Sequence, residues 1–242
     1  MVRHFGDWLR SIFPWFFRHY NGLEVRGVEN LPAQGSAIIA SNHSGGMDLD
    51  NFCLMSALEH VKTSNPARKR IWLCYWDKWS AEDNSWARFV RKFSPIPISL
   101  TGGGIPYRLV DRIVERGELL AIMPEGHSAS LREGYRLWKF YPGVIKLHAR
   151  YGIPIIPTAS IGFVKASPII SNQYNPKKVP PWEKEVMVPF ILPKKLIIHF
   201  GEPLTLVKHL DGDLSKQKMF QLASKVREKV AEMISLYKNE VR

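Results

Sequence analysis

The chain has few cysteines, few acidic residues and no long hydrophobic run. Its 242 residues include only two cysteines, Cys53 and Cys74, which lie far apart in apolar surroundings. Two such residues form neither a disulfide framework nor a zinc cluster, so we expect buried thiols in a reducing compartment. No apolar run reaches roughly 18 residues, so we expect no ordinary membrane-spanning helix.

The shortage of acids leaves a strong positive charge. Lys and Arg number 34 against 22 Asp and Glu, which gives a formal net charge of +12. This charge favours polyanionic partners such as nucleic acid, anionic lipid or a phosphate-bearing cofactor, and it does not rank them. Aromatic residues reach 12%, with eight tryptophans, which suits a packed core, a ligand channel or a membrane interface.

Residues 1–20 have the pattern of an amphipathic segment with Arg at its flanks. Pro14 is expected to kink or end the first helix, so two short helices are predicted. They could lie in a membrane interface, which we favour, or pack on the protein's own core. The uncharged run 11–17 is too short for a typical signal peptide. The apolar residues at helical spacing are Phe5, Trp8, Leu9, Ile12 and Phe16.

The rest of the chain, 21–242, alternates strand and helix patterns and predicts one α/β domain. Such alternation indicates a mostly parallel central sheet flanked by helices, with sites beyond the carboxyl ends of the strands. A Pro- and Lys-rich stretch, 165–194, interrupts the alternation. Strands are expected at 23–27, 36–41, 71–76, 95–99, 118–123, 153–160 and 195–200, and helices at 47–59, 84–93, 106–117, 142–152 and from 213 onward.

The stretch SNHSGGMD, residues 41–48, follows an apolar strand pattern directly. On one continuous helix His43 and Asp48 would point about 140° apart, but Gly45-Gly46 lets the chain turn between them. We expect Asp48, in the first turn of the next helix, to accept a hydrogen bond from His43. The imidazole would then be a general base. The alternative is a loop histidine followed by a helix-capping aspartate.

A second polar stretch, IMPEGHSAS, follows another buried strand pattern. Glu125, beside Gly126, is well placed to receive a substrate hydroxyl or amine, although a surface turn would also accommodate it. The residues around Ser128 nearly match a nucleophile elbow but lack its final glycine. A covalent serine mechanism is therefore not expected.

The ordered set NHSGGMD, MPEG and GIPIIPTAS resembles the glycerolipid acyltransferase family, and spans residue 42 to about residue 160. The later pattern looks most like the branch of monoacylglycerol and diacylglycerol acyltransferases. The resemblance implies that His43 is the base, that Asp48 is its partner and that Glu125 helps to bind the acceptor. It also implies a thioester donor, acyl-CoA or acyl-carrier protein, with no metal and no other cofactor.

Two departures from the family pattern concern the acceptor. Family members that use lysophosphatidic acid usually carry an Arg after the strand that matches PIPIS, where this chain has Ser99. They also often read FPEGTR, whereas His127 follows Gly126 here. Arg108, Arg112 or Lys139 could substitute, but the acceptor need not be a phosphate monoester. The expected substrate-binding residues are Gly45, Gly46, Ser99, Arg108, Glu125, Gly126 and His127.

The resulting hypothesis is direct acyl transfer to a lipid alcohol. Backbone N–H groups near Gly45-Gly46 or Gly126 would stabilise the tetrahedral oxyanion. The expected partners are a lipid acceptor, an acyl thioester or carrier protein, and the anionic cytoplasmic face of a membrane, with no nucleic acid. Two alternatives stay open: a non-enzymatic module for anionic membranes or nucleic acid, and a thioesterase or esterase that uses the same pair on water.

Overall fold

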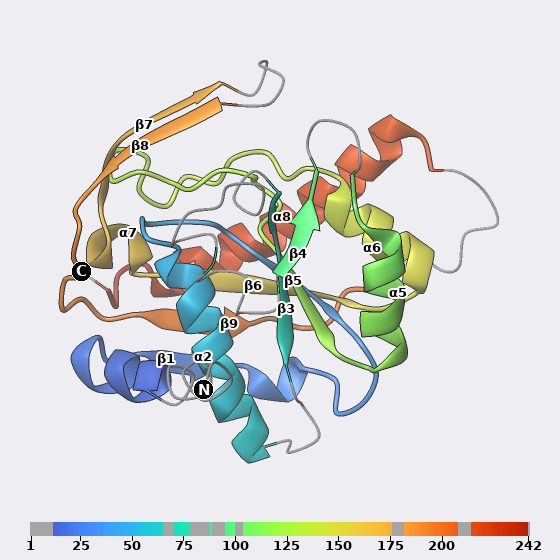
Figure 1. The fold of residues 1–242 in the computed structure, drawn as a ribbon, viewed down its shortest axis with the longest axis horizontal. Coiled ribbons are helices and arrows are strands. Elements are labelled where there is room, and N and C mark those ends of the chain that lie inside the picture. The colour runs from blue at the N-terminus through green and yellow to red at the C-terminus, as the bar shows by residue number, and fades with distance from the viewer. Residues whose placement is uncertain are drawn as a thin grey trace.

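A seven-stranded sheet with helices on both faces forms the body of the protein, as the computed structural model shows (Figure 1). This confirms the predicted α/β class. The structure describes residues 12–64, 70–77, 88, 95–99, 104–175, 182–207 and 214–241. The strands are β1 (Glu24–Arg26), β2 (Ile38–Ser41), β3 (Ile71–Trp76), β4 (Pro95–Ile98), β5 (Leu119–Ile122), β6 (Ile155–Ile161) and β9 (Ile197–Phe200).

The strand order is β1-β9-β6-β2-β5-β3-β4, and most neighbours are parallel. Among the described strands of this sheet, only β6 and β9 pair antiparallel, so β1 and β9 run against the other five strands. Parallel pairs join β2 to β5 and to β6, and β3 to β5 and to β4. The carboxyl ends of the neighbouring strands β2 and β5 therefore lie side by side, at the end of the sheet where a site is expected.

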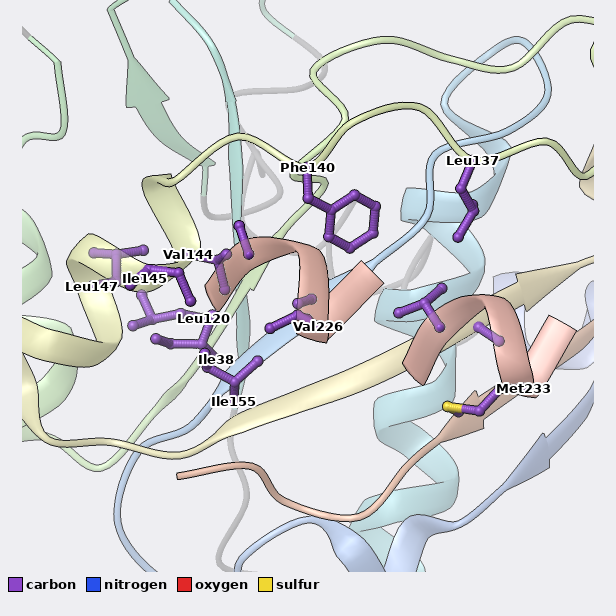
Figure 2. Close-up of a cluster of buried hydrophobic side chains, with 14 of the residues drawn as sticks. Ile38, Leu120, Leu137, Phe140, Val144, Ile145, Leu147, Ile155, Val226 and Met233 are labelled. Carbon is purple, nitrogen blue, oxygen red and sulfur yellow. The ribbon is translucent and has the colours of Figure 1, made fainter. Parts of the chain in front are cut away.

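Apolar side chains on both faces of the sheet form two cores. In β2, Ile38 faces one core and Ile39 the other, and both are fully buried, as the unbroken apolar run predicts. Figure 2 shows the first core, where Ile38, Leu120 and Ile155 from three adjacent strands meet helices α6 and α8. The helices are η1 (Val28–Asn30), α2 (Leu49–Ser64), α5 (Tyr107–Glu115), α6 (Gly143–Tyr151), α7 (Phe163–Ala166) and α8 (Lys216–Tyr237).

Residues 12–20 form a further helix, which continues through Pro14, so Pro14 does not end it. Phe17 is buried in the second core, whereas Trp15 is 63% exposed. This segment thus packs on the protein and also presents an aromatic side chain outward. The predictions for residues 1–11, and almost all of the helix predicted at 84–93, lie outside the described residues. Within the described part of the chain, no helix has the length and hydropathy to cross a membrane.

Two antiparallel strands lie within the stretch 165–194 and are not among the predicted elements. They form a hairpin of β7 (Ile169–Asn175) and β8 (Trp182–Met187), which projects from the body at the upper left of Figure 1. The strands pair with each other rather than with the main sheet. Their polar residues give no apolar run, which is why the pattern of this stretch does not reveal them.

Both cysteines are free thiols, and Cys53 is buried as predicted, whereas Cys74 is only half-buried. Cys53 is fully buried on α2, and burial raises the pKa of its thiol. Burial also raises the pKa of the Cys74 thiol to about 12. A thiol with so high a pKa is a poor nucleophile at neutral pH, so neither cysteine is suited to catalysis.

Gly162 connects β6 to α7 at a point where no other residue fits. Its φ of 97° is disfavoured for residues with a side chain, and a Cβ there would lie 2.1 Å from the carbonyl oxygen of Lys195. Its N–H group donates a hydrogen bond to the Tyr135 hydroxyl at 3.1 Å. The close approach fixes the start of α7, which packs against the turn that follows β2.

We expect Gly162→Ala to lower the free energy of unfolding by more than about 3 kcal/mol. Left-handed strain of about 1–2 kcal/mol adds to the overlap with the Lys195 carbonyl. Gly22→Ala is the matched control, because Gly22 has a φ of 56° and no atom within 4 Å of the added Cβ. Urea unfolding of both variants measures the difference, and equal losses would contradict the packing argument.

Candidate active site

The site begins where β2 leaves the sheet, and Asn42 fixes the direction of the chain there. Its side-chain oxygen accepts a hydrogen bond from the backbone N–H of Ser160 at 2.8 Å, and its side-chain nitrogen donates to the carbonyl of the same residue at 2.9 Å. The hydroxyl groups of Ser41 and Ser160 also lie 2.9 Å apart. Asn42 therefore extends the pairing of β2 with β6 by side-chain bonds and holds the next residue, His43, at the sheet edge.

The carboxylate that holds the imidazole of His43 belongs to Asp50. Nδ1 of His43 and Oδ2 of Asp50 are 2.7 Å apart. The same oxygen accepts the backbone N–H of Ser44 at 2.9 Å, and Oδ1 accepts that of Asn51 at 2.8 Å. Asp50 is fully buried in the first turn of α2. These three donors satisfy the buried charge and orient the imidazole.

The sequence prediction of a hydrogen bond from His43 to Asp48 is therefore corrected. Met47 and Asp48 have φ values of 59° and 50°, and α2 begins at Leu49 rather than at Met47. This later start puts Asp50 in the place where Asp48 was expected. Asp48 still lies close enough for its charge to raise the pKa of His43.

Opposing effects set the pKa of the His43 imidazole. Burial lowers it, but the charge and hydrogen bond of Asp50, together with the charges of Asp48 and Glu185, outweigh burial and raise the pKa above its ordinary value. The side chain keeps 16% of its surface exposed. With Nδ1 bonded to Asp50, Nε2 is the nitrogen that can exchange a proton with a substrate.

Glu125 lies beside His43, and both of its side-chain oxygens bind backbone groups. Oε1 accepts the N–H of His43 at 3.0 Å, and Oε2 accepts the N–H of Trp138 at 2.6 Å. Only 2% of the residue is exposed. Burial raises the pKa of Glu125 to about 7, and the two backbone donors oppose that rise. The structure thus shows Glu125 bonded to the protein, whereas the sequence predicts a contact with a substrate hydroxyl.

Backbone groups that the sequence suggests as oxyanion donors are engaged within the protein. The N–H of Gly45 donates to Ala129 O at 3.3 Å, that of Gly46 to Ser167 O at 2.7 Å, and that of Gly126 to Met123 O at 3.1 Å. The N–H groups of these three glycines are therefore not preformed oxyanion donors, and the expectation of such donors near them stays a prediction.

The two glycines of the turn serve close packing. A Cβ on Gly45 would lie 2.6 Å from the carbonyl oxygen of Phe163, and one on Gly46 would lie 2.9 Å from Sδ of Met187. The turn is therefore pressed against α7 and β8, where a larger residue would displace it.

The remaining predicted residues lie around this centre. His127 is buried, with Nδ1 3.1 Å from the Asn172 side-chain nitrogen and Nε2 3.5 Å from Glu133 Oε1. Ser99 follows β4, the last strand in the strand order, and its backbone N–H donates to the carbonyl of Gly104. Arg108 is exposed on α5. Thus His127 adjoins the His43 loop, whereas Ser99 follows β4, beyond β3 in the strand order, and Arg108 is on α5, which contacts β5.

Several residues of the site escape sequence reasoning. Asp50 is missed because Asp48 is closer to His43 in the sequence, and Asn42 is missed because asparagine is common in turns. Asn172 and Glu185 come from the unpredicted hairpin, which Met187 attaches to the turn. The position of Asn42, between a buried strand and His43, is the one sequence signal that could indicate its role. In the described ranges, no three His, Cys, Asp or Glu side chains gather in a way that could hold a metal ion.

Comparison with known proteins places this geometry in a family. The Acyltransferase family matches residues 22–161, more than half of the chain, including both loops of the site. The chain belongs to the Acyltransferase family. The family resemblance drawn from NHSGGMD, MPEG and GIPIIPTAS is confirmed at this level.

The fold is similar to a solved acyltransferase, and the sequence to mycobacterial proteins. The crystal structure of PlsC, a 1-acyl-sn-glycerophosphate (LPA) acyltransferase from Thermotoga maritima, matches with a TM-score of 0.56 and 13% identity, over 97% of this chain and 79% of that chain. Uncharacterized proteins of Mycobacterium tuberculosis and Mycobacterium bovis are 27% identical over 249 residues. These alignments cover 96% of this chain and 66% of each relative, so the chain spans just under two thirds of their length.

The hydrogen bond to Asp50 predicts which carboxylate controls the pKa of His43. We expect Asp50→Asn to lower that pKa, because it removes a bonded charge, and Asp48→Asn to lower it less. NMR titration of labelled histidine measures both, with His43→Gln to assign the signal among eight histidines. A larger shift in Asp48→Asn would contradict the assignment of Asp50.

Proposed function

We propose that this protein transfers a fatty acyl group from an acyl thioester to the hydroxyl group of a lipid alcohol. The observation that carries the proposal is the 2.7 Å contact between His43 Nδ1 and Asp50 at the carboxyl end of β2, inside the region that matches the Acyltransferase family. An imidazole oriented by a buried carboxylate is a suitable general base for an alcohol.

The reaction balances without any added cofactor. The acceptor hydroxyl gives its proton to Nε2 of His43 while its oxygen bonds to the thioester carbonyl carbon. Asp50 stabilises the imidazolium that forms. When the tetrahedral intermediate collapses, the carbon–sulfur bond breaks, the thiolate leaves, and the proton passes from His43 to sulfur. The products are an ester and a free thiol, of coenzyme A or of a carrier protein.

The charges around His43 favour an acceptor without a phosphate monoester. Asp48, Asp50 and Glu185 all raise the pKa of the imidazole, so negative charge gathers on this side of the site. A phosphate monoester would add about two further negative charges. A neutral lipid alcohol, or a lysolipid with a shielded headgroup, brings no such repulsion.

We also propose that the protein works on the anionic cytoplasmic face of a membrane. Trp15, Tyr20 and Phe190 are 63%, 42% and 58% exposed. The Tyr20 hydroxyl donates to the Ile191 carbonyl at 3.0 Å, which links the N-terminal helix to the segment after β8. Exposed aromatic side chains and a net charge of +12 both suit an anionic lipid surface.

Lipid products identify the reaction. Purified protein receives acyl-CoA or acyl-carrier protein with diacylglycerol, monoacylglycerol, lysophosphatidic acid or lysophosphatidylcholine in vesicles, and mass spectrometry detects new esters. We expect a new ester with the uncharged acceptors, and a loss of about 10²–10⁴-fold in His43→Gln. Thioester consumption without a lipid product would indicate hydrolysis instead, and undiminished transfer in His43→Gln would reject the assigned base.

The two carboxylates near His43 are expected to differ in their effect on rate. Asp50→Asn should reduce kcat by about 10²-fold or more, since it removes the group that orients and charges the imidazole. Asp48→Asn should reduce kcat less than about tenfold, since its charge acts without the direct bond. The reverse order would restore the pairing that the sequence suggests.

The pH dependence follows from the raised pKa of His43. The base is active only when it is neutral, so kcat should rise with pH through a midpoint above the ordinary histidine value of about 6.5. In Asp50→Asn the pKa falls, and the midpoint should move to lower pH. A midpoint that does not differ between wild type and Asp50→Asn would contradict the mechanism.

A further inference from the structure

Glu125 joins two segments that are far apart in the sequence. One of its oxygens accepts the N–H of His43, just after β2, and the other accepts the N–H of Trp138, just before α6. The distances are 3.0 and 2.6 Å, and the residue is almost fully buried. A carboxylate accepts hydrogen bonds but donates none, so it suits two backbone N–H groups that converge on it.

The Trp138 segment is itself firmly attached to the body. Arg227, on α8, donates to the carbonyl of Trp138 and to that of Leu137, each at 2.8 Å. The N–H of Tyr141 donates to the Pro124 carbonyl at 2.7 Å, which closes the loop on the strand end that carries Glu125. Glu125 thus connects the backbone of His43 to an anchored segment.

The loop that carries Glu125 also binds the carbonyl group of His43. The N–H of Ala129 donates to the His43 carbonyl at 2.9 Å, and Ala129 accepts from Gly45 at 3.3 Å. Ser44 and Ala129 form a parallel bridge, which continues the pairing of β2 with β5 beyond the ends of the strands. The backbone of His43 is therefore held on both sides by residues 125–129.

We propose that Glu125 is a positioning residue, which holds the His43 backbone so that the imidazole meets Asp50, rather than a group that binds the acceptor hydroxyl. This inference rests on the proposed function for its catalytic meaning. Both oxygens already bind the protein, and only 2% of the residue is exposed. Loss of the bond from His43 removes one of the two restraints on its backbone, and loss of the bond from Trp138 detaches Glu125 from the anchored segment. Small displacements of a catalytic group reduce turnover strongly.

Glu125→Gln tests the proposal, because the amide keeps one acceptor oxygen but turns an NH₂ group toward one of the two backbone donors. Glu133→Gln is the matched control. Glu133 lies on the same loop, and it accepts hydrogen bonds from Ser130 and from the Trp138 indole rather than from the His43 backbone. Thermal unfolding establishes that both variants are folded.

Positioning and acceptor binding predict different results for Glu125→Gln. Positioning predicts that kcat falls about 10–100-fold while KM for the acceptor changes less than about twofold, with a shifted His43 imidazole NMR signal. Glu133→Gln should leave that signal in place. A raised acceptor KM with an unchanged His43 signal would overturn the proposal and assign Glu125 to acceptor binding.

Two further measurements keep the inference separate from the proposed function. If wild type transfers no acyl group, the His43 signal in Glu125→Gln still decides whether Glu125 positions the imidazole. If Glu125→Gln does not fold, hydrogen exchange of the wild type decides. The amides of His43 and Trp138 should be strongly protected, and exchange as fast as in an exposed loop would overturn the proposal.

Discussion

The buried carboxylate of Asp50 is the interaction on which the site depends. An unpaired buried charge costs several kcal/mol, so Asp50 is stable there only while its donors stay in place. Those donors are the His43 imidazole and the N–H groups of Ser44 and Asn51. The first turn of α2, the turn before it and the orientation of the His43 imidazole therefore depend on one another.

The sheet makes this arrangement possible because it brings two loops to one edge. β2 and β5 are parallel neighbours, so the segments that carry His43 and Glu125 leave the sheet in the same direction. Asn42 fixes the first segment against β6, and the pairing of Ser44 with Ala129 fixes it against the second. The frame is held by backbone hydrogen bonds, which tolerate many sequences, whereas the imidazole depends on particular side chains.

Much of the frame can be predicted from the sequence, because buried parallel strands have unbroken apolar runs. Ile38 and Ile39 are buried on opposite faces, so the strand that contains them can be recognised from its apolar run. The β7–β8 hairpin cannot be recognised from the hydrophobic pattern, since its paired strands contain polar residues such as Ser171 and Asn172. The choice between Asp48 and Asp50 is also hidden, because it depends on a backbone conformation that non-glycine residues seldom adopt.

That conformation has an energetic consequence for the site. Met47 and Asp48 both lie in the left-handed region, at a cost of about 1–2 kcal/mol each, close to Asp50, which is bonded to the His43 imidazole. Such strain persists only where the surroundings hold it in place. Here Gly46 donates to Ser167, and the turn packs closely against Met187 of the hairpin. The hairpin and α7 therefore support the site indirectly, because they keep the strained turn in the geometry that brings Asp50 to His43.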